Sequence, residues 1–178
     1  TLDRATGLLD DEGYLHRLAV GVHEHAKSEA VAAEIRAQIE RALDDGIDAT
    51  HVDSHMLTVF EPRLFPVYVQ TALEYDLPPF VVRGIGNWVH PDTPASIKQE
   101  LDVLAADLEA QGVPVFDHID VFDLSNHEDR LAEGKRALAQ APAGGLTNIL
   151  HHMSADTPEL RAIAPDWRCR VADWQLFT

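Results

Sequence analysis

The stretch of sequence that decides the fold is SEAVAAEIRAQIERALDDGIDATHVDSH, residues 28–55. Its first part, 28–45, carries apolar residues every three or four positions, which predicts a helix with Ser28 as N-cap and Gly46 as its stop. The next part, 49–54, is short and rich in β-formers, and it predicts a strand. A helix followed at once by a strand is the repeating unit of α/β folds.

The same alternation continues along the rest of the chain. The expected helices cover 62–75, 94–111 and 127–140, with Asn126 capping the last one, and shorter helices follow from 157 and from near Arg168; the expected strands cover 80–82, 113–116 and 145–151. Parallel strands need crossover connections of this length, so the pattern predicts an α/β fold on a parallel sheet, either a barrel or an open sheet.

Composition excludes several functional classes. The 178 residues, 46% of them hydrophobic, predict a single globular domain over 1–178. Fourteen Lys and Arg against 30 Asp and Glu give a net charge of −16, which disfavours nucleic acid and acidic membranes as partners. Cys169 is the one cysteine, so we expect no internal disulfide and a cytoplasmic protein. A homodimer is compatible with this composition.

Candidate functional residues follow the expected strands, because side chains at the carboxyl ends of parallel strands meet at one edge. Five of the ten histidines belong to this set. The set comprises His51, Asp53 and His55 after the first strand, Arg83 after the second, Asp117 and His118 after the third, and His151 and His152 after the fourth.

Each candidate has a functional and a structural interpretation. On a strand, His51, Asp53 and His55 would share one face and could supply N and O ligands to a divalent metal; alternatively, Asp53 caps the following loop. His151 or His152 could act as a general acid or base, because an imidazole titrates near neutral pH, or could simply be packed. Arg83 could bind a substrate oxygen or form a structural salt bridge.

The segment Thr50-His51-Val52-Asp53-Ser54-His55 resembles the Thr-His-Leu-Asp-Ser-His signature of the YdjC-like (ChbG/HpnK) carbohydrate deacetylases. The similarity also covers residues 37–47, residues 62–83 and the closing segment from Thr157 to Asp173, and so extends over nearly the whole chain.

The resemblance implies a metal-dependent hydrolase that removes an acetyl group from an N-acetylated mono- or oligosaccharide, on a distorted (β/α) barrel. It implies one divalent ion, Zn or Mg, held by an Asp and two His. Carried onto this sequence, it assigns His55 to the metal, His152, Asp53 and Arg170 to catalysis, and Arg83 and His51 to the substrate. It further pairs Arg170 with Asp173. Met153 replaces the Pro that usually follows the strand-end His, so His151 competes with His152.

Three features of the family are missing from this sequence. The opening strand with Asp-Asp-Phe-Gly and the Gly-x-His segment do not occur, and the last strand is also absent. His23 in Val20-Gly21-Val22-His23 is rejected as the missing ligand because it follows residues 8–13, which lie downstream of the true His in the family. We therefore expect a barrel that is incomplete at both ends, since such barrels need roughly 250 residues. The alternatives are a catalytically incomplete remnant or carbohydrate-binding module of the same fold, and an unrelated metallohydrolase if the resemblance is accidental.

Overall fold

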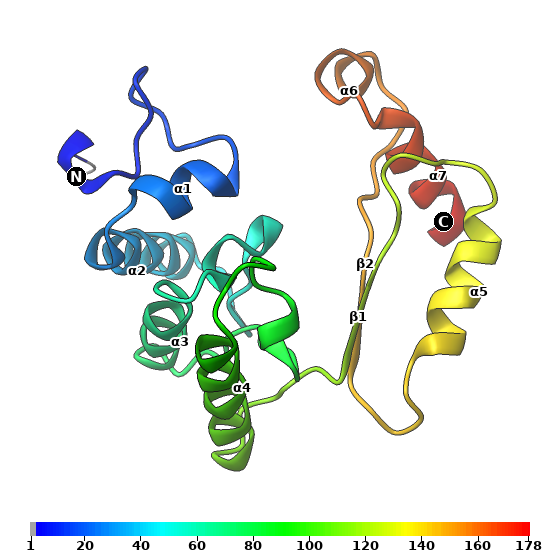
Figure 1. Cartoon of the computed structure of the whole chain (residues 1–178). Coiled ribbons are helices and arrows are strands. Elements are labelled where there is room, and N and C mark those ends of the chain that lie inside the picture. Colours follow the sequence, from blue (N-terminus) through cyan, green and yellow to red (C-terminus); the bar gives the residue numbers. More distant parts are fainter. Residues whose placement is uncertain (1–2) are drawn as a thin grey trace. The chain divides into compact units, whose positions relative to one another are not determined.

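The computed structural model describes residues 3–178 and divides the chain into two compact units, one up to Val115 and one from Phe116 (Figure 1). Helices alternate with extended segments, and the second unit contains a parallel sheet. The α/β class predicted from the sequence is therefore confirmed. The described residues contain one ladder of two strands, so they do not form a closed barrel by themselves.

The first unit is mainly helical. Its elements are η1 (Arg4–Thr6), α1 (Ala19–His25), α2 (Ser28–Asp44), η2 (His55–Phe60), α3 (Phe65–Leu73), η3 (Ile85–Asn87) and α4 (Ala95–Ala110). The three longest helices agree with the predicted ranges to within a few residues. Ser28 is the first residue of α2 rather than its cap, and Lys27 occupies the N-cap position without a side-chain hydrogen bond.

Aromatic and aliphatic side chains of α3 form the core of this unit. Phe65 and Tyr68 are buried on α3, and the ring of Phe60 lies 5.6 Å from that of Phe65 and 6.1 Å from that of Phe80. Helix α2 packs against α3, and its buried residues Val31, Ala32 and Ile39 come from the apolar stripe read in the sequence. The periodicity of residues 28–45 thus reports the face that is buried.

The predicted strands 49–54 and 80–82 are reduced to an isolated parallel bridge between Val52 and Pro79. The Val52 N–H donates to the Pro78 carbonyl, and the Phe80 N–H donates to the Val52 carbonyl. The two segments lie side by side as parallel strands would, but the predicted strands are too long, because the ladder stops after one bridge. A strand is recognised by repeated pairing, and the backbone turns away at Ser54, where η2 begins.

The second unit is a small α/β layer. Strands β1 (His118–Val121) and β2 (Thr147–Leu150) pair in parallel with His118 opposite Thr147, and α5 (Arg130–Gln140) connects them. Helices α6 (Pro158–Ile163) and α7 (Trp167–Phe177) follow. Helices α5 and α7 lie on the same side of the two strands in Figure 1. Phe122 is buried on that side, 6.2 Å from the ring of Phe177.

Two sequence predictions in this unit are wrong. The third strand was expected at 113–116, with Asp117 and His118 after its end, but His118 begins β1. The reason is the turn before β2: the Leu146 carbonyl accepts from the Asp117 N–H, and Asp117 Oδ2 accepts from the Leu146 N–H, so pairing starts only there. Asp117 and His118 therefore lie at the amino end of β1, at the opposite end of the ladder from His151 and His152.

Helix α5 also begins later than predicted. Its cap is Asp129, whose carboxylate accepts from the Ala132 N–H at 3.2 Å, whereas Asn126 accepts from the Glu128 N–H in the preceding turn. Asn126 and Asp129 are both good acceptors for the free N–H groups of a helix start, so the sequence alone does not distinguish which of them caps α5.

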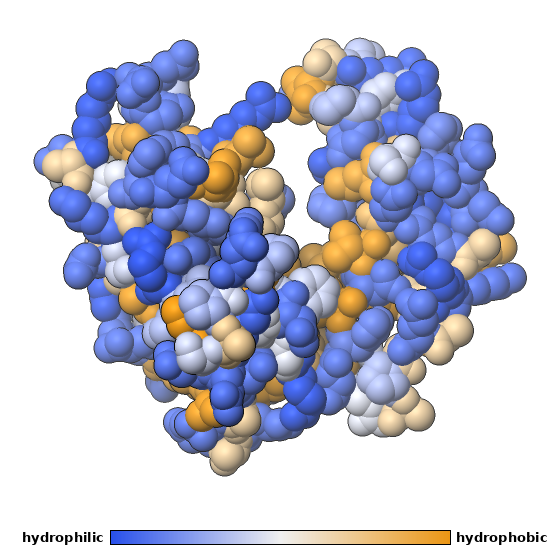
Figure 2. All heavy atoms as spheres, in the orientation of Figure 1, coloured by the Kyte–Doolittle hydropathy of each residue, from blue (hydrophilic) through white to orange (hydrophobic). Residues whose placement is uncertain are grey.

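The surface turned toward the viewer in Figure 2 is mostly hydrophilic, in keeping with the net charge of −16. Among residues 3–178, no helix is long and apolar enough to cross a membrane.

Candidate functional site

Ser54 organises the turn that carries Asp53 and His55 in the first unit. Its N–H donates to Asp53 Oδ1 at 2.6 Å, its carbonyl accepts from the Leu57 N–H at 3.0 Å, and its buried Oγ accepts from the Val59 N–H at 3.2 Å. The Thr58 hydroxyl donates to the His55 carbonyl at 2.9 Å. These bonds fix the backbone on both sides of His55.

The two residues after His55 adopt a left-handed backbone. Met56 has φ 56° and Leu57 has φ 53°, a region that residues with a Cβ occupy at a cost of roughly 1–2 kcal/mol each. Such strain persists only where surrounding contacts over-determine it, and it collects at functional sites. The hydrogen bonds of Ser54 are those contacts here.

Tyr68 of α3 holds the segment before the turn. Its hydroxyl donates to the Val52 carbonyl and accepts from the Phe80 N–H at 2.7 Å, so one side chain joins both partners of the parallel bridge. Burial raises the pKa of the Tyr68 hydroxyl well above its usual range, the hydrogen bond from Phe80 acts in the opposite direction, and the nearby Asp53 carboxylate raises it further. The Tyr68 hydroxyl is therefore protonated, and its role is to hold the two bridged segments together.

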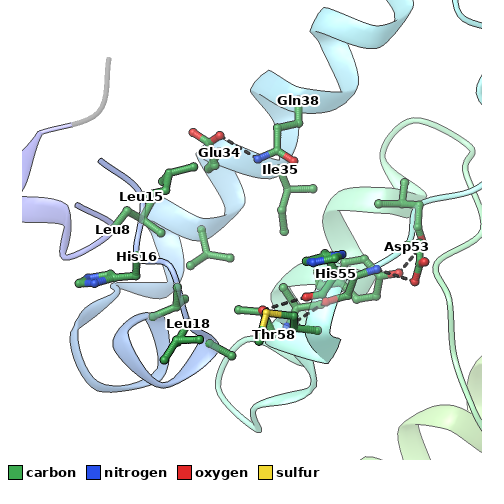
Figure 3. A pocket seen from close by; sticks show the side chains of 18 of the residues that line it. Leu8, Leu15, His16, Leu18, Glu34, Ile35, Gln38, Asp53, His55 and Thr58 are labelled. Carbon is green, nitrogen blue, oxygen red and sulfur yellow. Dashed lines mark hydrogen bonds between the residues drawn. The ribbon is translucent and has the colours of Figure 1, made fainter. Parts of the chain in front are cut away.

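Asp53 and His55 line one cavity of about 320 Å³ within the first unit. In Figure 3 they lie on one wall, Glu34 and Gln38 of α2 lie on a second, and Leu15 and His16 lie on a third. The remaining lining is mainly aliphatic and includes Leu8, Leu18, Val22, Val31, Ile35, Ile39, Val52 and Val59. A cavity with mostly apolar walls and a few convergent polar groups is the usual form of a small-molecule site.

The donor atoms in this cavity fit part of a metal site. Asp53 offers carboxylate oxygens and His55 offers an imidazole, which are ligand types for Zn or Mg. His16 lies farther away, and its Nε2 is 3.1 Å from the Gly7 carbonyl oxygen. Within residues 3–178 there is no group of three His, Cys, Asp or Glu that could hold a metal ion. A complete coordination sphere would need ligands from outside these residues.

His23, which sequence reasoning rejected as a ligand, supports the turn instead. Its Nε2 lies 2.8 Å from the Thr58 carbonyl oxygen, so α1 is attached to η2. The His23 ring therefore has a defined structural partner.

His51 and Arg83 do not line the cavity. His51 is exposed, and its Nδ1 lies 2.9 Å from the Thr50 hydroxyl. The segment pairs only at Val52 and turns at Ser54, so its side chains do not alternate between two faces as they would on a continuous strand. The Arg83 guanidinium makes two hydrogen bonds to the Glu109 carboxylate, at 2.8 and 2.6 Å. This is the salt bridge that the sequence left open as an alternative to substrate binding.

The two histidines after β2 have different surroundings in the second unit. His151 stacks on Phe177 with ring centroids 4.5 Å apart and lies edge-on to Phe122, and its buried Nδ1 finds no hydrogen-bond partner among residues 3–178. His151 is thus packed with the helices. The N–H of His152 donates to Asp173 Oδ2 at 3.0 Å. Of the two, His152 is the one held by a carboxylate at the end of the strand.

The expected pair of Arg170 and Asp173 is wrong. Arg170 binds Asp166, with Nε to Oδ1 and Nη2 to Oδ2 both at 2.9 Å, and Asp173 pairs with Arg130, whose Nε lies 2.9 Å from Oδ1. Arg170 and Asp166 are four residues apart at the start of α7, where side chains readily meet, whereas Asp173 is completely buried and faces α5. The Arg170 guanidinium lowers the pKa of Asp166 by hydrogen bonding.

Sequence reasoning missed Ser54, Tyr68 and Arg130. Ser54 has a short hydroxyl side chain of the kind that bonds to neighbouring backbone groups in turns. Tyr68 lies on the apolar face of a helix, where a buried hydroxyl needs a partner. Arg130 has a local partner in Glu133, three residues along α5, but its partner Asp173 is far away in the sequence.

Comparison of the sequence with known proteins identifies a matching protein family. The model of the YdjC-like protein family matches residues 1–178. A carbohydrate deacetylase from Thermus thermophilus is 33% identical over 176 residues, which cover 97% of this chain and 61% of that protein. A carbohydrate deacetylase from Thermoanaerobacter pseudethanolicus is 28% identical over 76 residues, 43% of this chain and 30% of that protein. The chain thus spans less than two thirds of either relative.

A solved structure supports the fold. The crystal structure of a protein described as a cellobiose-phosphate cleavage protein from Enterococcus faecalis V583 superposes with a TM-score of 0.67, at 21% identity, over 98% of this chain and 62% of that one. At this identity the likeness concerns the fold alone. With the family model matching along its whole length, the chain belongs to the YdjC-like family.

Proposed function

We propose that this chain is part of a carbohydrate N-deacetylase, a hydrolase that removes the acetyl group from an N-acetylated mono- or oligosaccharide. The observation that carries the proposal is the cavity in which Asp53 and His55 lie together, in a chain that resembles a carbohydrate deacetylase over 97% of its length. Because this chain spans 61% of that relative, we assign the activity to the longer protein rather than to residues 1–178 alone.

We also propose one divalent ion, Zn or Mg, with His55 as the ligand that this chain supplies. The donor chemistry of His55 and Asp53 supports this, and the remaining ligands would come from a segment outside residues 1–178. A bound ion would polarise the acetamide carbonyl.

The residues of this chain would share the proton transfers and the binding of the sugar. Hydrolysis joins the oxygen of water to the carbonyl carbon and breaks the carbon–nitrogen bond, giving acetate and an amine. In the proposal, Asp53 accepts the proton of the water and His152 donates one to the departing nitrogen. Arg170 is assigned a supporting catalytic role, and Arg83 and His51 are assigned to sugar hydroxyls.

We further propose that the Val52 bridge and the β1–β2 ladder are parts of one distorted (β/α) barrel in the longer protein. The TM-score of 0.67 against a structure of which this chain covers 62% supports a larger common fold. A single domain, a cytoplasmic location and a homodimer are included in the proposal.

The test is acetate release by the longest protein that contains this chain. Wild type, His55→Ala and His90→Ala are incubated with short N-acetylglucosamine oligomers, with Zn or Mg and with a chelator. His90 is a matched control, because it is an exposed histidine of the same unit that does not line the cavity. We expect chelator-sensitive release by wild type and His90→Ala, and a loss of 10-fold or more in His55→Ala, on the order of what a metal-site change costs.

No acetate release by wild type with either metal would overturn the deacetylase proposal. If the same protein still binds the oligomers in calorimetry, the result favours the carbohydrate-binding module, because the protein would retain sugar affinity without chemistry.

A further inference from the structure

A buried ion network lies behind the end of β2 and has no part in the chemistry proposed above. Asp173 of α7 is completely buried and Arg130 of α5 is 5% exposed. Arg130 Nε lies 2.9 Å from Asp173 Oδ1, and Arg130 Nη1 binds the Glu133 carboxylate. Two carboxylates, the fully buried one of Asp173 and the partly buried one of Glu133, therefore share the buried Arg130 guanidinium. Glu133 Oε1 also lies 3.9 Å from Arg136 Nη2.

The network holds the main chain at two places that are far apart in the sequence. Asp173 Oδ2 accepts the N–H of His152 at 3.0 Å, and Glu133 Oε1 accepts the N–H of Asp123 at 2.7 Å. Asp123 lies two residues after β1, and His152 lies two residues after β2. The network thus joins the first turns that follow the two paired strands, at the edge where parallel strands present functional groups.

Stability alone is a poor explanation for such a network. Burying charges is costly, and well-packed apolar residues often replace a buried ion pair without loss of stability. Here both carboxylates also bind main-chain N–H groups, and the Arg130 guanidinium lies 5.6 Å above the Phe122 ring. This specific arrangement fixes the position of the chain more than it adds to the core.

We propose that Asp173, Arg130 and Glu133 are positioning residues, which fix the backbone of His152 relative to the turn after β1 and thereby orient its imidazole. The assignment of proton transfer to that imidazole rests on the proposed function; the positioning does not. Asp166, whose pKa is lowered mainly by its hydrogen bond with Arg170 and also by its charge interaction with His152, is a second carboxylate near this histidine.

The experiment compares three conservative variants with one control in the longest protein that contains this chain. The variants are Asp173→Asn, Arg130→Lys and Glu133→Gln. The control is Asp156→Asn, which breaks an exposed ion pair with Arg161 in the same unit. Two readouts are taken: the pH titration of the His152 ring by NMR, and kcat and KM for acetate release over the same pH range.

We expect the ring signal of His152 to shift and its titration midpoint to move in each network variant but not in Asp156→Asn. Activity should fall by about 10-fold or more in kcat with KM nearly unchanged, as when a supporting residue is lost. If Asp173→Asn does not fold, Arg130→Lys and Glu133→Gln carry the test.

The proposal is overturned if every folded network variant keeps the titration and kcat of the control, or if none of the three folds, because the network would then be purely structural. A wild type that releases no acetate would refute the proposed function only, since the NMR readout still decides the positioning.

Discussion

At the scale of single residues, Ser54 determines how His55 is presented. Its backbone and side chain make hydrogen bonds to Asp53, Leu57 and Val59, and the strained residues Met56 and Leu57 follow directly. Without these bonds the left-handed turn would have little to hold it. The geometry of the candidate site therefore depends on a residue that takes no part in the proposed chemistry.

Ser54→Ala should lower the free energy of unfolding by about 1–2 kcal/mol, because the Val59 N–H loses its buried acceptor. Ser96→Ala, on the exposed first turn of α4, is the control and should change it by less than about 0.5 kcal/mol. Urea unfolding of both variants checks this. Equal midpoints for the two would show that Ser54 does not hold the turn.

At the scale of elements, two helices of the second unit, α5 and α7, have an aspartate at the N-cap position. Asp129 begins α5 with φ 54° and an accepting carboxylate, and Asp166 begins α7 next to Arg170. Negative charge at a helix N-terminus is favourable because free N–H groups point toward it. Asp129 thus sets where α5 begins, whereas Asp166 places a negative charge at the start of α7 without a side-chain capping hydrogen bond.

Asp129→Ala should destabilise the protein by about 1–2 kcal/mol, because alanine can neither cap α5 nor easily adopt a left-handed backbone. Asp129→Asn keeps the acceptor and tolerates that backbone, so it should be close to wild type. Thermal unfolding compares the two. The cap assignment would be refuted by an Asn variant that is as unstable as the Ala variant.

Asp166→Asn tests the pH dependence of the Arg170 pair. The hydrogen bond lowers the pKa of Asp166 below its usual 3.8, so its contribution is fully present above that value and is lost as the pH falls through the lower folded value. The variant should be less stable than wild type by no more than about 1 kcal/mol, because the ion pair is partly exposed. This difference in the free energy of unfolding should be constant from neutral pH down to about pH 5 and should shrink below pH 3.8.

The measurement is urea unfolding of both proteins at several pH values. Asp92→Asn, an exposed carboxylate with 93% of its side chain accessible, is the control and should show no such trend. A stability difference that grows as the pH falls would contradict the lowered pKa of Asp166.

At the scale of the whole molecule, charge dominates behaviour toward polyanions. The chain carries −16 at neutral pH, and its 14 positive residues are scattered among 30 acids. Such a surface repels phosphate backbones at low ionic strength, where screening is weakest.

We therefore expect no mobility shift of duplex DNA and no binding to anionic vesicles in about 50 mM salt, where electrostatic binding is strong. Vesicles with a cationic lipid serve as the positive control. Retention on DNA at this ionic strength would reveal a basic surface that the net charge conceals.

The sequence by itself determined the position of the longer helices to within a few residues, the α/β class and the family. Apolar spacing in 28–45 and 94–111 reports which side of a helix is buried, and this information is local. The Asp-Ser-His segment was found in the same way, because its residues are neighbours along the chain. The sites assigned to His55, His152 and the other candidates stay predictions.

Only the tertiary structure decided which of these residues lie together. It placed Asp53 and His55 in one cavity without His51, attached Arg83 to Glu109, and joined Asp173 to Arg130 instead of Arg170. The extent of the strands was decided there too, since a strand exists only where a partner segment pairs with it. The physical reason is the same in each case: these contacts join distant parts of the chain, and local patterns carry no information about such partners.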